Sequence, residues 1–267
     1  MLSPWKFADA CVIGSAHERS GLPCQDALLI RELESQRGET CLFAAVADGA
    51  GSETQAREAA RLACGSMGYL LGRFLDLHEP HEITEELVGQ YVQTTTEVFV
   101  ERANELQSDP QEFACTLVLA LVWRGGAIYA QIGDGAIVVT SQASPDDWNW
   151  IFWPDKGEFE NETVFLRPGC QPVVQFAQTD QRPLELALFT DGVQILALHY
   201  ATRTVHAPFM ETLLAPLRME AFPGRCLTIS NDLATFLASE RVDERSSDDK
   251  SLILGTRRSW TGGIIPG

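Results

Sequence analysis

Long apolar runs are missing from this chain of 267 residues, and no stretch of about 18 apolar residues could span a bilayer. The N-terminus lacks the basic and then apolar pattern of a secretion signal, because Lys6 stands alone between Trp5 and Phe7. The seven cysteines form no Cys-x-x-Cys pair and lie mostly within apolar segments. We therefore expect a cytosolic protein without a membrane partner, whose cysteines are small buried residues rather than a disulfide framework or a zinc site.

Clusters of Lys and Arg are also absent, whereas acidic residues are abundant. The chain has 37 Asp and Glu against 20 Lys and Arg, which gives a formal net charge of −17. Such a charge would repel a phosphate backbone, so we expect no nucleic-acid partner. The same acidity suits a protein that collects cations, and a generic acidic cation-binding or scaffold protein is one interpretation.

Short apolar segments between polar or Gly/Pro residues predict strands in two batches. They lie at 7–13, 27–33, 41–47, 113–123, 127–132, 136–141, 176–178, 184–190 and 251–255. Apolar spacings of three and four predict two long helices at 53–75 and 82–106, and further helices at 208–218 and 225–238. Strand batches with helices between and after them favour stacked antiparallel sheets covered by helices over a doubly wound fold.

The turns and long connections give further predictions. The first fifty residues predict a strand meander, and Gly133-Asp134-Gly135 is a candidate hairpin or tight turn. The segment 144–171 is rich in Trp, Pro and acidic residues, so we expect a flap outside the core sheet. One hydrophobic core suffices for a chain of this length, so 1–267 is predicted to be a single domain with a short tail at 256–267.

Three Asp-Gly pairs occur, and each follows an apolar segment that predicts a strand. The pairs are Asp48-Gly49, Asp134-Gly135 and Asp191-Gly192. Chance predicts about one such pair at this composition, and each could be a simple turn, so the position at strand ends is more informative than the count. A glycine after the carboxylate lets the backbone bend, so that the Asp side chain and the Gly carbonyl can face one cation.

Two more acidic positions adjoin predicted strands. Gln25-Asp26 precedes the strand at 27–33, and Asp248-Asp249 precedes the strand at 251–255. Oxygen ligands without His or Cys partners are typical of Mg²⁺ or Mn²⁺ rather than zinc or copper. The sequence therefore predicts a site for a hard divalent cation, built from carboxylates at strand ends.

Five segments around these acidic residues resemble, in type and in order, the motifs of the PPM or type 2C metal-dependent serine/threonine protein phosphatases. They are Cys24-Gln25-Asp26-Ala27, Val46 to Ser52, Ile132 to Gly135, Phe189 to Val193 and Asp248 to Leu252. A single match would be weak, because Asp-Gly turns are common. Five matches in order, over nearly the whole chain, argue against coincidence.

The resemblance implies an α+β fold, a four-layer αββα sandwich of two antiparallel sheets flanked by helices, with two Mn²⁺ or Mg²⁺ ions at one end. It implies that Asp48 bridges both ions, that the Gly49 carbonyl holds one of them, and that Asp191 and Asp248 complete the other. A water between the ions would hydrolyse phosphoserine and phosphothreonine in proteins. Asp134, with Asp191, matches positions that hold a third, weaker ion in the family.

The first motif departs from the family pattern. The family usually has a Glu beside the Asp, whereas this chain has Gln25, which offers a carbonyl oxygen without charge. We therefore expect Gln25 and Asp26 to bind the second ion weakly or through water. The family's phosphate-binding Arg normally lies five residues before that Asp, where this chain has Gly21, and Arg19 is the candidate replacement.

Two further departures concern the acid and the last motif. Many eukaryotic members have a His after the second Asp-Gly, where this chain has Ala50. His17 is a candidate for the acid or for a phosphate contact because His titrates near neutrality, and capping of a strand end is the equally weighted alternative. In the last motif Asp249 replaces the commoner Asn, and Asp248 is the expected ligand because the following strand then aligns.

These features support two functions of different class. The retained Asp48, Asp191 and Asp248 support an active phosphatase, and this is the function that we favour. The departures at Gln25, Gly21 and Ala50 support a catalytically weak regulatory module, a pseudophosphatase that binds phosphoproteins or a kinase. The expected partners of the enzyme are a phosphorylated protein substrate and a cognate Ser/Thr kinase.

Overall fold

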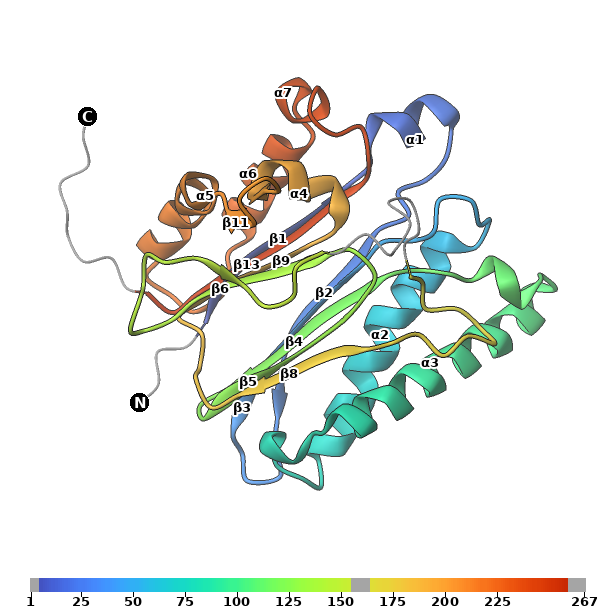
Figure 1. Ribbon diagram of the computed structural model, residues 1–267, viewed down its shortest axis with the longest axis horizontal. Coiled ribbons are helices and arrows are strands. Elements are labelled where there is room, and N and C mark those ends of the chain that lie inside the picture. Colours follow the sequence, from blue (N-terminus) through green and yellow to red (C-terminus); the bar gives the residue numbers. More distant parts are fainter. Residues whose placement is uncertain (1–4, 155–163, 259–267) are drawn as a thin grey trace.

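Two β-sheets lie face to face between two layers of helices in the computed structural model, which describes residues 5–154 and 164–258 (Figure 1). The predicted four-layer αββα sandwich is confirmed. One pairing departs from the antiparallel rule, because β12 (Gly224–Arg225) runs parallel to β1 (Lys6–Val12). Within the described residues no helix is both long and apolar enough to cross a membrane.

The two sheets have different strand orders. The five-stranded sheet has the order β2-β3-β4-β5-β8, formed by Ala27–Glu34, Thr40–Ala47, Leu117–Trp123, Gly126–Ile132 and Gln175–Thr179. The six-stranded sheet has the order β12-β1-β13-β9-β6-β7, and its members not yet given are Lys250–Thr256, Glu185–Phe189, Ala136–Thr140 and Asn149–Trp150. A separate hairpin joins β10 (Leu198–His199) to β11 (Thr204–Val205).

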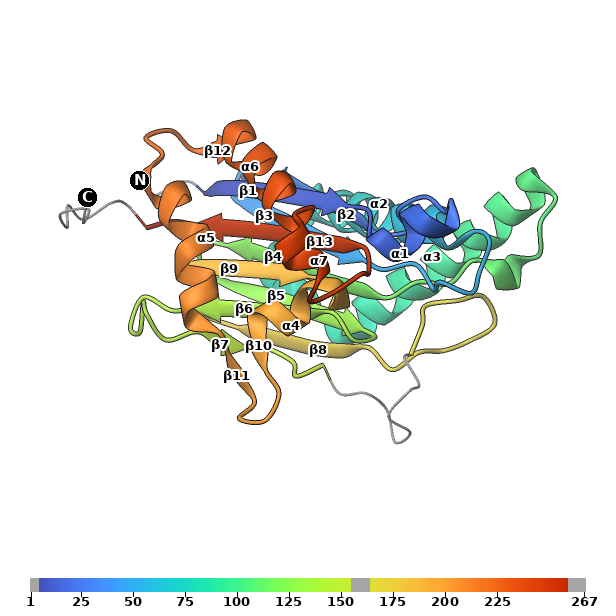
Figure 2. The ribbon, with the colours of Figure 1, turned by 90° about the horizontal axis from the view of Figure 1, so that it is seen from above.

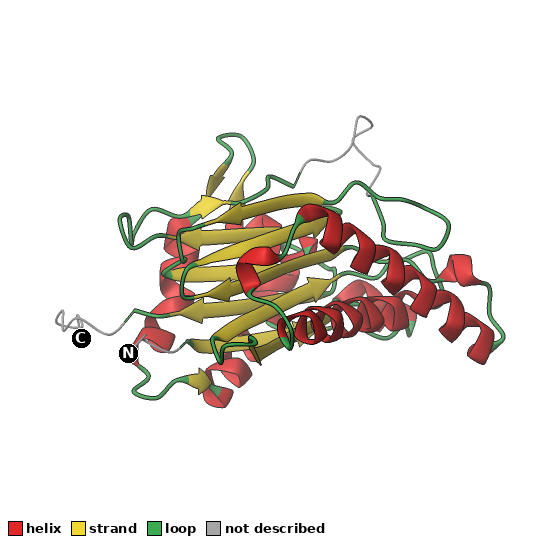
Figure 3. Cartoon of the chain, turned by 90° about the horizontal axis from the view of Figure 1, so that it is seen from below, coloured by secondary structure: helices red, strands yellow, loops and turns green. Residues whose placement is uncertain are grey.

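The helices cover the outer face of each sheet. The long helices α2 (Ala56–Leu75) and α3 (Glu85–Leu106) lie on the five-stranded sheet (Figure 3). The six-stranded sheet carries α4 (Asp191–Ala197), α5 (Ala207–Met219), α6 (Leu227–Leu237) and α7 (Glu240–Asp243) (Figure 2). A short helix, α1 (Ser15–Ser20), follows β1, and two single turns lie at Pro80–Glu82 and Pro110–Glu112.

Strand β4 shows why these sequences form central strands. All of its residues are buried, because one face packs on the helices and the other on the second sheet. Successive side chains point to opposite faces, so Leu119 and Leu121 pack with α2 and α3, whereas Val118 and Val122 pack between the sheets. A third apolar layer under α4, α5 and α6 includes Phe189.

Two predictions of local structure are wrong. The meander of the first fifty residues is wrong, because β1 pairs with β13 in the six-stranded sheet while β2 and β3 belong to the other sheet. Gly133-Asp134-Gly135 is not a hairpin turn, because the chain passes there from β5 in one sheet to β6 in the other. Both errors arise because an apolar alternating segment does not specify which sheet it joins.

The predicted flap at 144–171 is only partly outside the sheet. Within it, β7 pairs with β6 at the sheet edge, and Trp148 and Trp153 are buried against the helical layer. Leu166 forms an isolated bridge with Cys115. Residues 155–163 of the flap and 259–267 of the predicted tail lie outside the described residues. Strand β13 extends through Thr256, the first residue of that tail.

Candidate active site

Five aspartates lie beside strand ends that the register of the two sheets brings to one end of the sandwich. In the five-stranded sheet Ala27 pairs with Ala47, so Asp26 and Asp48 adjoin the same rung. In the six-stranded sheet Phe189 pairs with both Ala136 and Leu252. The same rung therefore brings together the chain ends that carry the remaining three aspartates: Asp134, Asp191 and Asp248.

Asp48 is held through its backbone by a neighbouring strand end. Its N–H donates to the Thr116 hydroxyl at 2.9 Å, and its carbonyl accepts from the Thr116 N–H at 2.7 Å. The next residue, Gly49, forms a bridge with Cys115. These contacts fix the direction of the backbone while the carboxyl group of Asp48 remains half-buried at the strand end.

The carboxyl groups are close enough to oppose one another's ionisation. Burial raises the pKa of Asp48 well above its usual value, and the charges of Asp26 and Asp191 add to this effect. Burial raises the pKa of Asp26 to about 8. The pKa of Asp191 is also raised to about 8, by burial and then by the charges of Asp134 and Asp248. Such a cluster has a high affinity for positive charge.

Several buried oxygens of this cluster have no partner among the described residues. They are Oδ1 of Asp26, Oδ1 of Asp191 and Oε1 of Gln25. Buried acceptors are normally satisfied, so their grouping at one place points to a cation. In the described ranges no three His, Cys, Asp or Glu side chains already form a tight ligand set. Like charges repel without a counterion, so the carboxylates fit a divalent cation as ligands that would close around it.

Thr190 connects the two sheets at the site. Its hydroxyl donates to Oδ2 of Asp26 at 2.7 Å and accepts from the Ser251 N–H at 3.0 Å. Asp26 stands before β2, whereas Thr190 and Ser251 belong to the end of β9 and the start of β13. The single hydroxyl therefore aligns one carboxylate of the five-stranded sheet with the ends of two strands in the other sheet.

Asp249 organises the polar backbone around the cluster. Its carboxylate is almost fully buried and accepts from the Gly14 N–H at 2.7 Å, from the Gln25 N–H at 2.6 Å and from Nδ1 of His17 at 2.8 Å. The carboxylate of Asp248 lies at the surface, where its Oδ1 accepts from the Asp249 N–H. The two adjacent acids thus have different roles. The carboxylate of Asp249 accepts hydrogen bonds from protein groups, whereas the carboxylate of Asp248 faces solvent.

Two glycines allow the backbone to approach this segment closely. A Cβ atom at Gly14 would lie 2.2 Å from the carbonyl carbon of Asp248, and one at Gly192 would lie 2.0 Å from the carbonyl oxygen of Asp249. Either distance is far below a van der Waals contact. A side chain at either position would displace the loop that carries Asp248, so glycine is required by the packing of the site.

The predicted catalytic residues His17 and Arg19 both lie on α1. The imidazole of His17 is mostly buried by its contact with Asp249, the residue directly before β13. Arg19 is exposed, and its Nη1 donates to the Ser15 hydroxyl at 3.0 Å. Gly21 ends this helix in the left-handed conformation at φ 70°, which explains a glycine at that position.

Asp134 adjoins the helix that begins at Asp191. The side-chain amide of Gln194, on α4, donates to the backbone carbonyl of Asp134, and the Tyr200 hydroxyl donates to the side-chain oxygen of Gln194. The carboxyl group of Asp134 contributes to the raised pKa of Asp191. The structure therefore places Asp134 at the edge of the cluster, beside Asp191.

Sequence reasoning missed the residues that hold the cluster together. Thr116, Thr190 and Asp249 were not predicted to have these roles. Thr190 had a detectable signal, because a Thr directly before a strand-end Asp can orient nearby carboxylates. Thr116 gave no such signal, since its partner Asp48 is 68 residues away.

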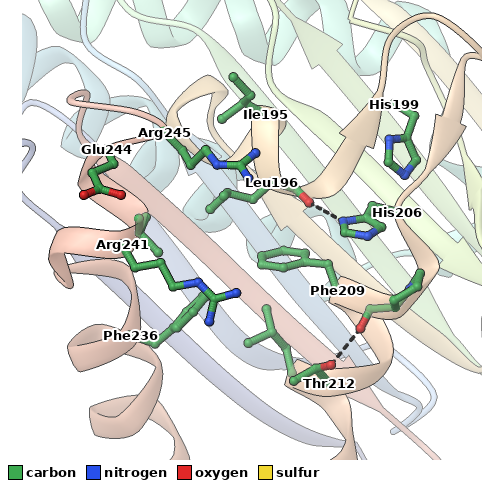
Figure 4. A pocket seen from close by; sticks show the side chains of 13 residues that line it. Ile195, Leu196, His199, His206, Phe209, Thr212, Phe236, Arg241, Glu244 and Arg245 are labelled. Atoms are coloured by element: carbon green, nitrogen blue, oxygen red, sulfur yellow. Dashed lines mark hydrogen bonds between the residues drawn. The ribbon is translucent and has the colours of Figure 1, made fainter.

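A separate cavity lies on the helical face of the six-stranded sheet. It has a volume of about 660 Å³ and lies between α4, α5, α6 and α7 (Figure 4). The rings of Phe209 and Phe236, 6.3 Å apart, line it together with Arg241 and Arg245. None of the five aspartates lines this cavity, so it is distinct from the carboxylate cluster.

The chain matches the family model described as Protein phosphatase 2C over residues 13–238. It is 32% identical, over 259 residues, to Serine/threonine-protein phosphatase 3 of Escherichia coli (strain K12), with 94% of this chain and 97% of that protein covered. Because the family model covers most of the chain, this protein belongs to the protein phosphatase 2C family. The resemblance found in the five motifs is confirmed, and the family depends on Mg²⁺ or Mn²⁺.

Solved structures show the same fold at low sequence identity. A bacterial serine phosphatase gives a TM-score of 0.58 at 17% identity, covering 97% of this chain and 99% of that one. The serine/threonine phosphatase Stp1 from Staphylococcus aureus gives 0.56 at 16%, covering 96% and 95%. RsbX in complex with magnesium gives 0.55 at 13%, covering 94% of each chain. These similarities support the αββα architecture.

We expect the metal-free protein to lose stability as the pH rises from about 5 to about 8. The pKa of both Asp26 and Asp191 is about 8 in the folded chain, against about 3.9 for an ordinary Asp. In the interval between these values the folded chain retains protons that the unfolded chain has released, so the free energy of unfolding falls with pH.

Denaturant unfolding in the presence of EDTA checks this expectation. The Asp191→Asn variant lacks one of these retained protons, so its stability should fall less steeply with pH. A free energy of unfolding that rises over the same interval in the metal-free wild type would contradict the electrostatics described above.

Proposed function

We propose that this chain hydrolyses phosphoserine and phosphothreonine in proteins at a centre of two Mg²⁺ or Mn²⁺ ions. The observation that carries the proposal is the grouping of five strand-end aspartates. Burial and the charges of neighbouring aspartates raise the pKa of Asp48 and of Asp191. The group also includes buried oxygens that have no partner among the described residues. Membership of the protein phosphatase 2C family and the E. coli serine/threonine-protein phosphatase as a relative support the same reaction.

The family resemblance assigns the ligands, and their positions at the strand ends support the assignment. The Asp48 carboxylate would bridge the two ions, the Gly49 carbonyl would hold one, and Asp191 and Asp248 would hold the other. The exposure of Asp248 supports this role, since its neighbour Asp249 is already saturated by hydrogen bonds. Asp134, beside Asp191, is the candidate ligand for a third and weaker ion.

Gln25 and Asp26 would hold the second ion weakly or through water. Both side chains are buried, and each has an oxygen without a partner among the described residues. The amide carries no charge, so the site has one negative charge fewer than a Glu would give it. We therefore expect this ion to bind more weakly than it would with a Glu at position 25, because affinity depends on the number of charged ligands.

When bound, such ions supply an activated water and neutralise the phosphoryl oxygens. The chain's own part is to hold the ligands and to move a proton. Because Nδ1 of His17 donates to the buried carboxylate of Asp249, Nε2 is the nitrogen that can exchange a proton with the leaving serine or threonine oxygen. His17 is the proposed acid, oriented by Asp249. Arg19, exposed on the same helix, is the proposed phosphate contact.

The experiment that tests the proposal is hydrolysis of p-nitrophenyl phosphate and of a phosphothreonine peptide with Mn²⁺, with Mg²⁺ and with EDTA. We expect turnover with at least one of the two metals, loss of turnover in EDTA, and recovery when excess metal is restored. A folded protein that binds Mn²⁺ but hydrolyses neither substrate would contradict the proposal. The phosphoprotein substrate itself implies a Ser/Thr kinase as the enzyme that supplies it.

A further inference from the structure

Two cysteines meet directly beside the carboxylate cluster. Cys11, near the end of β1, and Cys24, just before β2, have their sulfur atoms 3.6 Å apart. Cys11 is exposed and Cys24 is half-buried. In the described part of the chain no other two cysteines are recorded in sulfur–sulfur contact, and the other solvent-exposed thiol is Cys170. The pairing is therefore specific, and solutes can reach it.

The two sulfur atoms are in van der Waals contact. A sulfur–sulfur bond is about 2.05 Å long, so the two atoms need to approach by only about 1.5 Å. Cys11 is the last residue but one of β1, where it pairs with Ser251, whereas Cys24 lies outside any strand, three residues before β2, where small backbone shifts cost little. The segment 21–24 between α1 and Gln25 has no regular secondary structure, so a shift there breaks no helix or strand.

We propose that Cys11 and Cys24 are an oxidative modification site, at which a peroxide forms a reversible disulfide that lowers the metal affinity and activity of the phosphatase. Cys11, the more exposed sulfur, attacks one peroxide oxygen as a thiolate, forming a sulfenic acid and releasing hydroxide. The Cys24 thiolate then attacks that sulfur and displaces the hydroxyl group of the sulfenic acid, which takes up a proton and leaves as water. The two thiols lose two electrons and two protons, and hydrogen peroxide is reduced to two waters.

The effect on the site follows from what the two cysteines touch. The Cys11 thiol donates to the backbone carbonyl of Asp26 at 3.6 Å, and oxidation removes this donor. Cys24 adjoins Gln25, whose N–H donates to Asp249 at 2.6 Å. A disulfide would pull the chain just before these two residues towards β1. Metal ligands must be held within about 0.5 Å of their productive positions, so a shift of this size would disturb Asp26 and Gln25.

The activity readout rests on the proposed function, but the modification itself does not. The experiment oxidises metal-free wild-type protein with hydrogen peroxide, removes the peroxide, and maps disulfides by mass spectrometry of the digested protein. Calorimetry then measures Mn²⁺ affinity, and hydrolysis of a phosphothreonine peptide measures turnover, before and after treatment with a phosphine reductant. Cys11→Ser and Cys24→Ser cannot form the bond, and Cys170→Ser is the matched control at an exposed single thiol.

We expect a peptide pair linked through Cys11 and Cys24 in the wild type and in Cys170→Ser. Mn²⁺ affinity and turnover should fall by about 10–100-fold and recover on reduction, as for other changes in residues that support metal ligands. The Cys11→Ser and Cys24→Ser variants should keep their Mn²⁺ affinity under the same treatment. Absence of the linked pair would overturn the proposal, and so would a linked protein whose Mn²⁺ affinity is unchanged. If the wild type shows no turnover at all, the proposed function fails while the mapping and the calorimetry still test the modification.

Discussion

Replacing Asp48 with Asn is expected to lower metal-dependent turnover by about three orders of magnitude or more. The variant loses the carboxylate proposed to bridge the two ions, and metal ions contribute several kcal/mol to transition-state stabilisation, at about 1.4 kcal/mol for each tenfold in rate. The measurement is kcat for a phosphothreonine peptide at saturating Mn²⁺, together with Mn²⁺ affinity by calorimetry.

The same variant should be folded and at least as stable as the wild type without metal. The hydrogen bonds of Asp48 to Thr116 use its backbone, which the substitution leaves in place. A neutral side chain also relieves repulsion from Asp26 and Asp191. Turnover within tenfold of the wild type would contradict the bridging role, whereas loss of turnover through unfolding would appear as a lower free energy of unfolding.

Replacing Asp249 with Ala is expected to destabilise the fold by about 3–5 kcal/mol, the usual cost of removing one partner from a buried charged network. Its carboxylate is 1% exposed and accepts hydrogen bonds from Gly14, Gln25 and His17. The variant leaves two backbone N–H groups at the site without an acceptor. Denaturant unfolding in EDTA measures the effect without any contribution from bound metal.

The Asp249→Asn variant is the matched comparison. The amide of Asn keeps one accepting oxygen, but its NH₂ group replaces the other oxygen and faces N–H donors. The stability of this variant should therefore lie between those of the wild type and Asp249→Ala. A loss below about 1 kcal/mol in Asp249→Ala would contradict the organising role assigned to this residue.

The sequence was sufficient to predict the acidic positions and the layers. Asp48 and Asp191 follow apolar segments, and Asp26 and Asp248 precede them, so the strand ends are visible as changes of composition. The two long helices were predicted within three residues of their observed starts, because their apolar spacing is regular. Both signals are local, because each depends only on residues that are near one another in the sequence.

Other features depend on contacts that no local pattern records. The sheet membership of β1 and β6 is set by pairing with β13 and β9, which are distant in sequence. The hydrogen bonds of Asp249 span 224 to 235 residues, and the neighbouring sulfurs of Cys11 and Cys24 become apparent only once two strands are placed. Charge repulsion within the cluster likewise requires the strand ends to be brought together first.

The most direct test of the carboxylate cluster as the catalytic centre is the turnover of a phosphothreonine peptide by Asp191→Asn across a Mn²⁺ titration. Asp180→Asn, at an exposed Asp in the loop after β8, is the matched control. The predicted result is wild-type turnover for Asp180→Asn, and for Asp191→Asn a loss of at least about a hundredfold that excess Mn²⁺ does not fully restore. Equal turnover of the two variants at every Mn²⁺ concentration would contradict the account.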